Sequence, residues 1–293
     1  MDQRIDIGID GGGTGCRVVV CHGGREARAT GGPANVLTDP AAAEAAIRGA
    51  LWEALARLDL TRDDLGRARI VAGMAGCRLP GMTEAFAMRL PFLAYVVEDS
   101  VTALEGAFGG GRHGTLVSLG TGSFFIRRDA RGITHHGGWG FHLGDEGSAA
   151  WLGHRALSDM MQIADGRLSR YAGDPLLSVL EQATAPHPVV FASHARPEDY
   201  AALTPLILAA RTRWSAALVQ RITAMLRTAL HEIGHPVGSP WALTGGLGRA
   251  LVGWIDAQAA EIEDAENRDI LSGHFRPEGV ALDGALAMAR ALP

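Results

Sequence analysis

The chain has 293 residues, 47% of them hydrophobic and 20% charged, which suits one large or two medium globular domains. Its net charge of −5 offers no basic surface to nucleic acid, and its apolar runs are too short to span a membrane, so neither partner is expected. Three cysteines without a C-x-x-C pair, and an N-terminus without a basic segment before an apolar one, indicate a cytoplasmic protein without disulfides or a zinc site.

The first third of the chain alternates strands and helices. Strands are predicted at residues 4–9, 16–22, 25–30, 68–76 and 93–99. The first two form a hairpin, and the last two are expected to be buried and parallel, each followed by a helix. Asp39 and Pro40 are a typical N-cap and first helical residue, and they begin a helix of about 20 residues.

The same pattern restarts in the middle of the chain. Residues 114–128 again form a strand, a Gly-Thr-Gly turn and a strand. Thr14 and Thr121 hold matching places in the two hairpins, which indicates an internal duplication, with chance similarity of two short hairpins as the alternative. The later part is mostly helical, with helices predicted at 146–163, 174–184, 197–211 and 213–233. A strand, glycine turn and helix follow at 239–255.

These elements predict an α/β fold with two related domains. We place an N-terminal domain at 1–112 and a C-terminal domain with helical insertions at 113–280. The final helix, 281–293, is expected to pack back on the first domain. No low-complexity linker separates the halves, so we expect them to pack closely around a cleft.

Three glycine-rich turns follow predicted strands, at 10–14, 120–123 and 244–248. Glycine lets backbone N–H groups approach an anion, and threonine adds a hydroxyl donor, so these turns suit the phosphates of a nucleotide. The candidate ATP-binding residues are Gly12, Gly13, Thr14, Gly120, Thr121, Gly245 and Gly246. Asp10, at the end of the first strand, is the candidate for Mg²⁺, held through water. The alternative is three tight turns without a ligand.

The chain contains no lysine, so all 27 of its Lys and Arg residues are arginine. A Walker A loop and the eukaryotic-type protein kinase fold each need a lysine, so both are excluded. A dinucleotide-binding glycine loop should open a helix, whereas the residues after Gly15 are predicted as a strand. A nucleotide held by two hairpins remains, as in actin-like folds.

Asp99 ends the apolar strand predicted at 93–99 and begins a helix. Ligands of parallel sheets bind at the carboxyl ends of the strands, so Asp99 is the candidate catalytic base. It would accept the proton of a hydroxyl that attacks a γ-phosphate. The helix N-terminus is expected to lower the pKa of Asp99. A simple helix cap is the alternative, and Glu98 is expected to point to the opposite face.

The segment "HHGGWGFHLGDEGSAAWLG" at 135–153 combines glycines with histidines, Trp139, Asp145 and Glu146. Carboxylates and backbone groups bind sugar hydroxyls, and an aromatic side chain covers a sugar ring, so this loop suits a sugar. A metal site and a helix cap at Asp145 are the alternatives.

Several motifs occur together and in order: "GIDGGGTGCR", "VVEDSVTALEGAFGG", "LVSLGTGSF", "GGWGFHLGDEGSAAWLG", "ALTGGLGRAL" and "LDGALAMA". They span the chain and resemble the N-acetylglucosamine kinase and glucosamine kinase branch of the BadF/BadG/BcrA/BcrD ATPase family, within the actin, sugar-kinase and heat-shock-chaperone superfamily. "ARPEDYAALTPLILAA" also resembles the bacterial glucosamine-kinase branch.

The resemblance implies duplicated ribonuclease-H-like domains, with ATP and sugar in the cleft between them. It implies that Thr14 and Thr121 contact ATP phosphates, that Gly246 lies near the adenosine, and that Asp10 serves Mg²⁺. Asp99 matches the catalytic base. The positions that match sugar contacts are Asn35, Ser123, Gly138, Trp139 and Asp145. Phe124 stands where eukaryotic members have a polar residue, which leaves open how the 2-substituent is held.

The function that follows from the resemblance is ATP-dependent phosphorylation of the 6-hydroxyl of glucosamine or N-acetylglucosamine; homodimers occur in the family. One alternative is an activator ATPase, whose relatives hold an iron–sulfur cluster through cysteines in a later motif. Here Cys16 and Cys21 belong to the first hairpin and Cys77 follows a strand. A second alternative is a sugar sensor that has lost catalysis.

Overall fold

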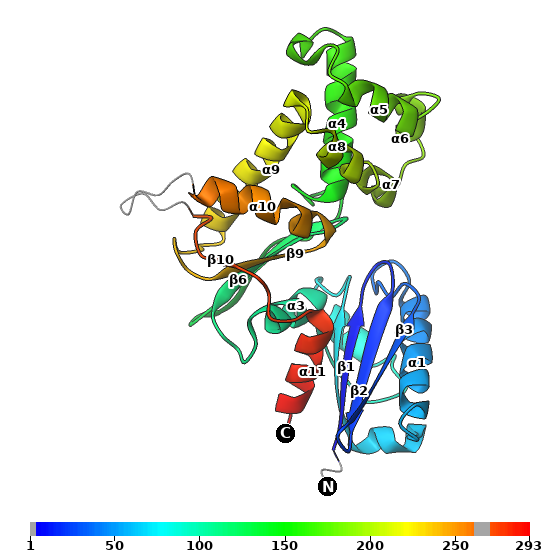
Figure 1. Cartoon of the computed structure of the whole chain (residues 1–293). Coiled ribbons are helices and arrows are strands. Elements are labelled where there is room, and N and C mark those ends of the chain that lie inside the picture. Colours follow the sequence, from blue (N-terminus) through cyan, green and yellow to red (C-terminus); the bar gives the residue numbers. More distant parts are fainter. Residues whose placement is uncertain (1–3, 261–269) are drawn as a thin grey trace. The chain divides into compact units, whose positions relative to one another are not determined.

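The computed structural model describes residues 4–260 and 270–293. The chain forms two compact units (Figure 1). The first unit comprises Met1–His113 and Arg276–Pro293, and the second comprises Gly114–Phe275. Among the described residues, no helix combines the length and the apolar character that crossing a membrane requires.

The first unit contains a mixed five-stranded sheet: β1 (Ile5–Gly11), β2 (Cys16–His22), β3 (Arg25–Gly31), β4 (Ala68–Met74) and β5 (Tyr95–Glu98). The strand order is β3-β2-β1-β4-β5. β1, β2 and β3 pair antiparallel, whereas β4 runs parallel to β1 and β5 parallel to β4. The hairpin and both parallel pairings agree with the sequence-based prediction.

Helices cover both faces of this sheet: α1 (Pro40–Ala56), α2 (Met82–Ala87), α3 (Asp99–Phe108) and α11 (Ala281–Ala291), with a short 3-10 helix, η1 (Arg62–Arg67). α1 packs against β2 and β3, and α11 packs against β1 and α3 on the other face (Figure 1). Strand alternation divides the core accordingly, since Val18 joins the α1 cluster and Val19 joins the α11 cluster. Asp39 caps α1 as predicted, accepting hydrogen bonds from the first-turn amides of Ala41 and Ala42.

The second unit repeats the topology of the first. Its sheet contains β6 (Gly114–Leu119), β7 (Ser123–Asp129), β8 (Gly132–Gly137), β9 (Trp241–Thr244) and β10 (His274–Phe275). The order is β10-β9-β6-β7-β8, with β6-β7-β8 antiparallel and β9 parallel to β6. β6 therefore corresponds to β1 and β9 to β4, and the predicted duplicated α/β fold is confirmed.

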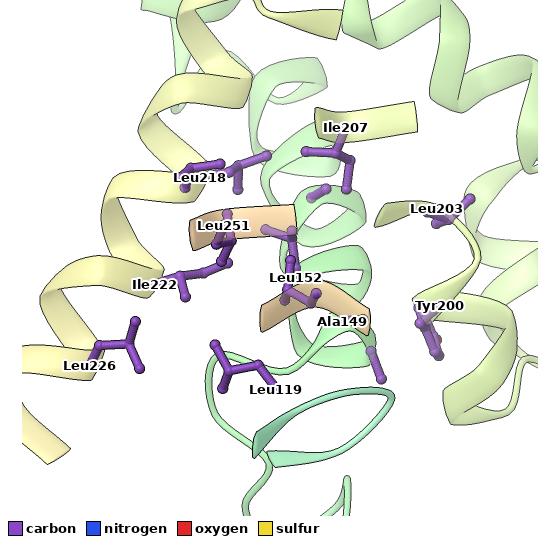
Figure 2. Close-up of a cluster of buried hydrophobic side chains, with 14 of the residues drawn as sticks. Leu119, Ala149, Leu152, Tyr200, Leu203, Ile207, Leu218, Ile222, Leu226 and Leu251 are labelled. Carbon is purple, nitrogen blue, oxygen red and sulfur yellow. The ribbon is translucent and has the colours of Figure 1, made fainter. Parts of the chain in front are cut away.

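The remainder of the second unit is helical: α4 (Ala149–Ala164), α5 (Leu176–Ala183), α6 (Pro188–Ala192), α7 (Pro197–Ala201), α8 (Thr204–Ala210), α9 (Arg213–Glu232), α10 (Gly246–Ala260) and the 3-10 helix η2 (Ser169–Tyr171). The apolar stripe of α9 enters the core, where Trp214, Leu218, Ile222 and Leu226 are fully buried. Figure 2 shows part of this core, with Leu218, Ile222 and Leu226 on the α9 side of α4.

Two sequence-based expectations about these elements are wrong. The helix predicted at 197–211 is broken into α7 and α8, because Pro205 has no N–H with which to continue a helical hydrogen-bond ladder. The strand predicted as buried at 93–99 is the short edge strand β5, and the side chain of Tyr95 is 55% exposed. The apolar side chains of β5 therefore lie on an edge strand that the rest of the fold covers only in part.

Candidate active site

The carboxyl ends of β1, β4 and β5 lie at one edge of the first sheet. Asp10 of β1 pairs with Gly73 of β4, and Asp99 begins α3 directly after β5. A Cβ at Gly73 would lie 2.1 Å from Oγ1 of Thr102, so α3 packs against β4 at a distance that only glycine allows. Thr102 Oγ1 also donates to the carbonyl of Asp99 at 2.9 Å. These contacts fix the first turn of α3, and with it Asp99, at the edge of the sheet.

The Asp99 carboxyl is partly buried, and its Oδ1 accepts a hydrogen bond from the amide of Ser100 at 3.0 Å. Burial, followed by the negative charge of Asp10, raises the pKa of Asp99 to about 6. The expectation of a lowered pKa is therefore wrong: the helix N-terminus and the Ser100 amide favour the anion, but desolvation and a second carboxylate outweigh them. At pH 7 the group is mostly ionised, and it is a stronger proton acceptor than an ordinary aspartate.

Asp10 is 6% exposed and forms a salt bridge with Arg17, which lies opposite it in the hairpin register. Burial raises the pKa of the Asp10 carboxyl, and the Arg17 guanidinium partly offsets this effect. A buried carboxylate that remains costly to ionise is stabilised further by a cation, so its chemistry fits a hydrated Mg²⁺. Arg17 was not singled out from the sequence; the signal that identifies it is its position opposite Asp10 in a tight hairpin.

The first glycine turn joins β1 to β2. The Gly12 amide donates to the carbonyl of Gly15, and the Gly12 carbonyl accepts from Ala34, both at 2.9 Å. Gly13 and Thr14 are exposed at the tip. No atom lies within 4 Å of a Cβ placed at Gly13, and its φ is not positive, so nothing in the described fold requires glycine there. Close approach of a ligand to the backbone would explain why residue 13 is a glycine.

The second glycine turn, between β6 and β7, is tied to the start of α4. The carbonyls of Gly120 and Thr121 accept hydrogen bonds from the amides of Ala149 and Ala150, at 2.9 and 3.2 Å. Two otherwise unpaired amides of the first turn of α4 are thereby satisfied, and the turn is held in place.

The third glycine turn lies next to the second, because β9 is the parallel neighbour of β6. Gly245 has a φ of +84°, and a Cβ there would lie 2.2 Å from the Leu119 carbonyl oxygen, so its glycine is a requirement of the fold. Gly246 begins α10 with no atom within 4 Å of the Cβ position. Of the two, only Gly246 leaves room for a ligand.

The sugar candidates of the second unit are directly connected. The Ser123 amide donates to Oδ1 of Asp145 at 3.2 Å, and the Ser123 carbonyl accepts from the Gly138 amide at 2.9 Å. A Cβ at Gly122 would lie 2.7 Å from Oδ2 of Asp145, so this glycine, which sequence reasoning missed, makes room for the carboxylate. Trp139 directly follows Gly138 in the sequence, and its side chain is 55% exposed. An exposed indole beside a buried carboxylate suits a polar ring.

Asp145 does not cap α4. Ser148 holds that place, its Oγ accepting from the Trp151 amide at 3.0 Å. Asp145 instead adopts the left-handed region, with a φ of 58°, and burial raises the pKa of its carboxyl. A strained, buried carboxylate is more typical of a binding site than of a cap.

Asn35 belongs to the first unit. Its Oδ1 accepts from the amides of Leu37 and Thr38 at 3.0 and 3.2 Å, which leaves the side-chain NH₂ group to donate to a ligand. The neighbouring backbone is tied to the ends of β1 and β4, since the amide of Ala34 donates to Gly12 and that of Val36 to Ala75. Asn35 therefore lies at the same edge of the sheet as Asp10 and Asp99.

The candidate residues thus gather within each unit, and the expectation that the two halves meet around a cleft stays a prediction.

Across the described ranges, no three His, Cys, Asp or Glu side chains are grouped to hold a metal ion. Cys16 and Cys77 are buried, and burial raises the pKa of both thiols, that of Cys77 to about 12. Both are therefore protonated at neutral pH.

The duplicated topology and the glycine hairpins define a protein with the actin-like fold. A ROK family glucokinase from Streptomyces griseus, solved with glucose and AMPPNP, shares this fold at 16% identity and a TM-score of 0.59, over 98% of each chain. Residues 7–232 match the BadF/BadG/BcrA/BcrD ATPase family, and the chain belongs to that family. The resemblance that the motifs indicated is confirmed at this level.

Two further relatives also match almost the whole chain. A structure described as a candidate N-acetylglucosamine kinase from Chromobacterium violaceum is 28% identical, with a TM-score of 0.82, over 98% of this chain and 99% of that chain. The glucosamine kinase GspK of Vibrio cholerae is 24% identical over 97% of this chain and 95% of its own length.

Proposed function

We propose that this protein transfers the γ-phosphoryl group of ATP to the 6-hydroxyl of an amino sugar, either glucosamine or N-acetylglucosamine. Membership of the ATPase family supports the use of ATP. The names of the Vibrio cholerae and Chromobacterium violaceum relatives support an amino sugar as acceptor. Asp99 is the proposed catalytic base, and the other candidate residues bind the two substrates.

The observation that carries the proposal is Asp99, which follows β5 with a pKa of about 6, raised by burial and by the nearby Asp10 charge. A base with a pKa just below the working pH is ionised, and it accepts a proton more readily than an ordinary aspartate. Phosphoryl transfer proceeds through a loose transition state, in which the acceptor hydroxyl loses its proton late. A carboxylate is therefore a sufficient base for a sugar hydroxyl.

ATP and Mg²⁺ are the proposed cofactors, with Asp10 holding the hydrated ion. When bound, Mg²⁺ neutralises the charge of the phosphates. Thr14 and Thr121 offer hydroxyl donors to the phosphates, and Gly12, Gly13 and Gly120 offer backbone approach. Gly246 is proposed to lie near the adenosine, with Gly245 supporting the turn.

The sugar is proposed to contact Asn35, Ser123, Gly138, Trp139 and Asp145. The Asn35 NH₂ group supplies donors, and the Asp145 carboxylate accepts from hydroxyls. The choice between the two sugars depends on the group at C2. An ammonium requires a carboxylate or carbonyl near it, whereas an acetyl group requires an apolar slot, for which Phe124 is a candidate wall.

The test is ADP release measured with glucosamine, N-acetylglucosamine, glucose and no sugar. The proposal expects release that depends on one of the two amino sugars. Asp99→Asn should abolish most of this activity, whereas the matched variant Glu98→Gln should keep most of it.

Three outcomes would contradict the proposal or the role of Asp99 in it. ADP release that is independent of sugar would favour the activator ATPase, and a purified protein with the colour of an iron–sulfur cluster would support that reading. Sugar binding without any ADP release would favour a sensor. Near-wild-type sugar phosphorylation by a folded Asp99→Asn protein would disprove the role of Asp99.

A further inference from the structure

The loop between β8 and α4 carries Trp139 and Asp145 on a backbone with little intrinsic preference for one conformation. Five glycines lie in the stretch from Gly137, the last residue of β8, to Gly147. Four of them adopt a positive φ: Gly137, Gly138, Gly140 and Gly147. Glycine loses the most conformational freedom on ordering, so such a loop needs specific anchors to hold a ligand-binding side chain in place.

The two ends of this loop are anchored on β7. The Gly138 amide donates to the carbonyl of Ser123, and the Asp145 carboxylate accepts from the Ser123 amide. Trp139 follows the first anchor directly, and five residues lie between it and Asp145, whose carboxylate also accepts from the Gly140 amide. These hydrogen bonds hold the main chain on either side of Trp139 but do not involve its indole ring.

A third anchor lies between them, at Phe141. Its ring stacks on Tyr200, with centroids 5.4 Å apart and planes at 25°, and meets the His154 ring edge-on at 5.7 Å. The His154 and Tyr200 rings also contact each other edge-on at 5.3 Å. Phe141 thus lies against two rings from two different helices, in geometries that stabilise aromatic pairs.

Tyr200 is a rigid support for this contact. It is 5% exposed and belongs to α7, whose backbone touches α4 so closely that a Cβ at Gly153 would lie 2.0 Å from the Tyr200 carbonyl oxygen. Thr204 Oγ1 donates to the carbonyl of Ala149, in the first turn of α4, at 2.9 Å. Figure 2 shows Tyr200 and Leu203 on the side of α4 opposite α9.

We propose that Phe141 is a positioning residue for the sugar site, and that Tyr200 of α7 fixes the orientation of Trp139 through the Phe141–Tyr200 stack. The inference rests on the proposed function, in which Trp139 contacts the sugar. It gives a role to the segment around Tyr200, which no phosphate or sugar candidate explains. The main chain on either side of Trp139 is anchored, at Gly138 by its hydrogen bond to Ser123 and at Phe141, two residues after Trp139, by the ring stack.

The test begins with Phe141→Ala. Loss of two ring contacts that orient the loop should raise the KM for the sugar about tenfold, with the KM for ATP changed less than about twofold and kcat reduced less than about threefold. Phe141→Tyr, which keeps the stacked ring, should restore the KM of the wild type.

The matched control is Phe191→Ala. Phe191 meets the Tyr200 ring edge-on at 5.7 Å, but it belongs to α6 rather than to the loop. Its loss should lower the thermal stability as Phe141→Ala does, while the sugar KM stays within about twofold of the wild type. Equal effects of the two variants on the sugar KM would overturn the proposal, because the ring cluster would then act through stability alone.

A second measurement needs no substrate. In protein labelled with 5-fluorotryptophan, the ¹⁹F resonance of Trp139, assigned with Trp139→Phe, should be a single line that broadens or splits in Phe141→Ala and not in Phe191→Ala. An unchanged Trp139 resonance in Phe141→Ala would overturn the positioning role whether or not the protein phosphorylates amino sugars. Failure of the proposed function would instead appear as the absence of sugar-dependent ADP release in the wild type.

Discussion

Replacing Asp99 with asparagine should make the protein more stable while removing its activity. The pKa of the native Asp99 carboxyl is about 6, against 3.8 for an unperturbed aspartate. The native state therefore binds this proton more tightly than the unfolded chain does. Below about pH 4 the carboxyl is protonated in both states, so its ionisation does not lower the free energy of unfolding. As the pH rises towards 6 the native state loses stability relative to the unfolded chain, and above about pH 6 this loss is complete. At about 1.4 kcal/mol per pH unit, the full cost is up to about 3 kcal/mol.

Asparagine removes this cost and keeps an Oδ1 that can accept from the Ser100 amide. Urea unfolding of Asp99→Asn and of the wild type should therefore differ by up to about 3 kcal/mol at pH 8 and by about half as much at pH 5. An equal gain at both pH values would refute the reasoning, because the effect would not come from ionisation. A loss of stability at pH 8 would refute it as well.

The activity of the same variant tests the chemistry. Loss of a general base typically reduces kcat by a factor of about 10² to 10⁴. In the wild type, kcat/KM should rise with pH through about 6, as Asp99 loses its proton. Glu98→Gln should keep most of kcat and move this acid limb to lower pH, because the Glu98 charge contributes to the raised pKa of Asp99. An acid limb that Asp99→Asn leaves unchanged would contradict the assignment.

Three further changes have defined outcomes. Gly13→Ala should raise the KM for ATP at unchanged thermal stability, whereas Gly49→Ala, equally free of neighbours but inside α1, should leave the KM unchanged and stabilise the helix by about 0.5–1 kcal/mol. Asp10→Asn should increase the Mg²⁺ concentration needed for half-maximal rate and shift the acid limb of kcat/KM below about pH 6, since the Asp10 charge raises the pKa of Asp99. Gly245→Ala should destabilise the second unit by more than about 3 kcal/mol in urea unfolding, because its Cβ would overlap a β6 carbonyl oxygen.

Local signals were enough to predict much of the fold. The Asp39–Pro40 pair predicted the start of α1, and the α9 stripe that begins at Trp214 predicted a buried helix face. Each of these two signals comes from residues that lie within a few helical turns of each other in the sequence. The break between α7 and α8 was missed although its cause, Pro205, is also local, because the apolar pattern continues across it.

The properties of the site depend on contacts that the sequence does not show directly. The sign of the Asp99 pKa shift was predicted wrongly, because the shift comes first from burial in the folded chain and then from the charge of Asp10, which lies on β1. The link from Asp145 to Ser123 joins positions 22 residues apart, and the Phe141–Tyr200 stack joins a loop to a helix far along the chain. Identities of candidate residues could be read from motifs, whereas their electrostatics and supports required the fold.

The central claim is tested most directly by identifying the reaction product. The protein is incubated with Mg²⁺, ATP and either glucosamine or N-acetylglucosamine, and the products are examined by ³¹P and ¹H NMR. The account predicts ADP in equal amount to one new sugar phosphate, with phosphorus coupled to the two protons at C6. ADP accompanied only by inorganic phosphate, or a phosphate attached at another carbon, would contradict it.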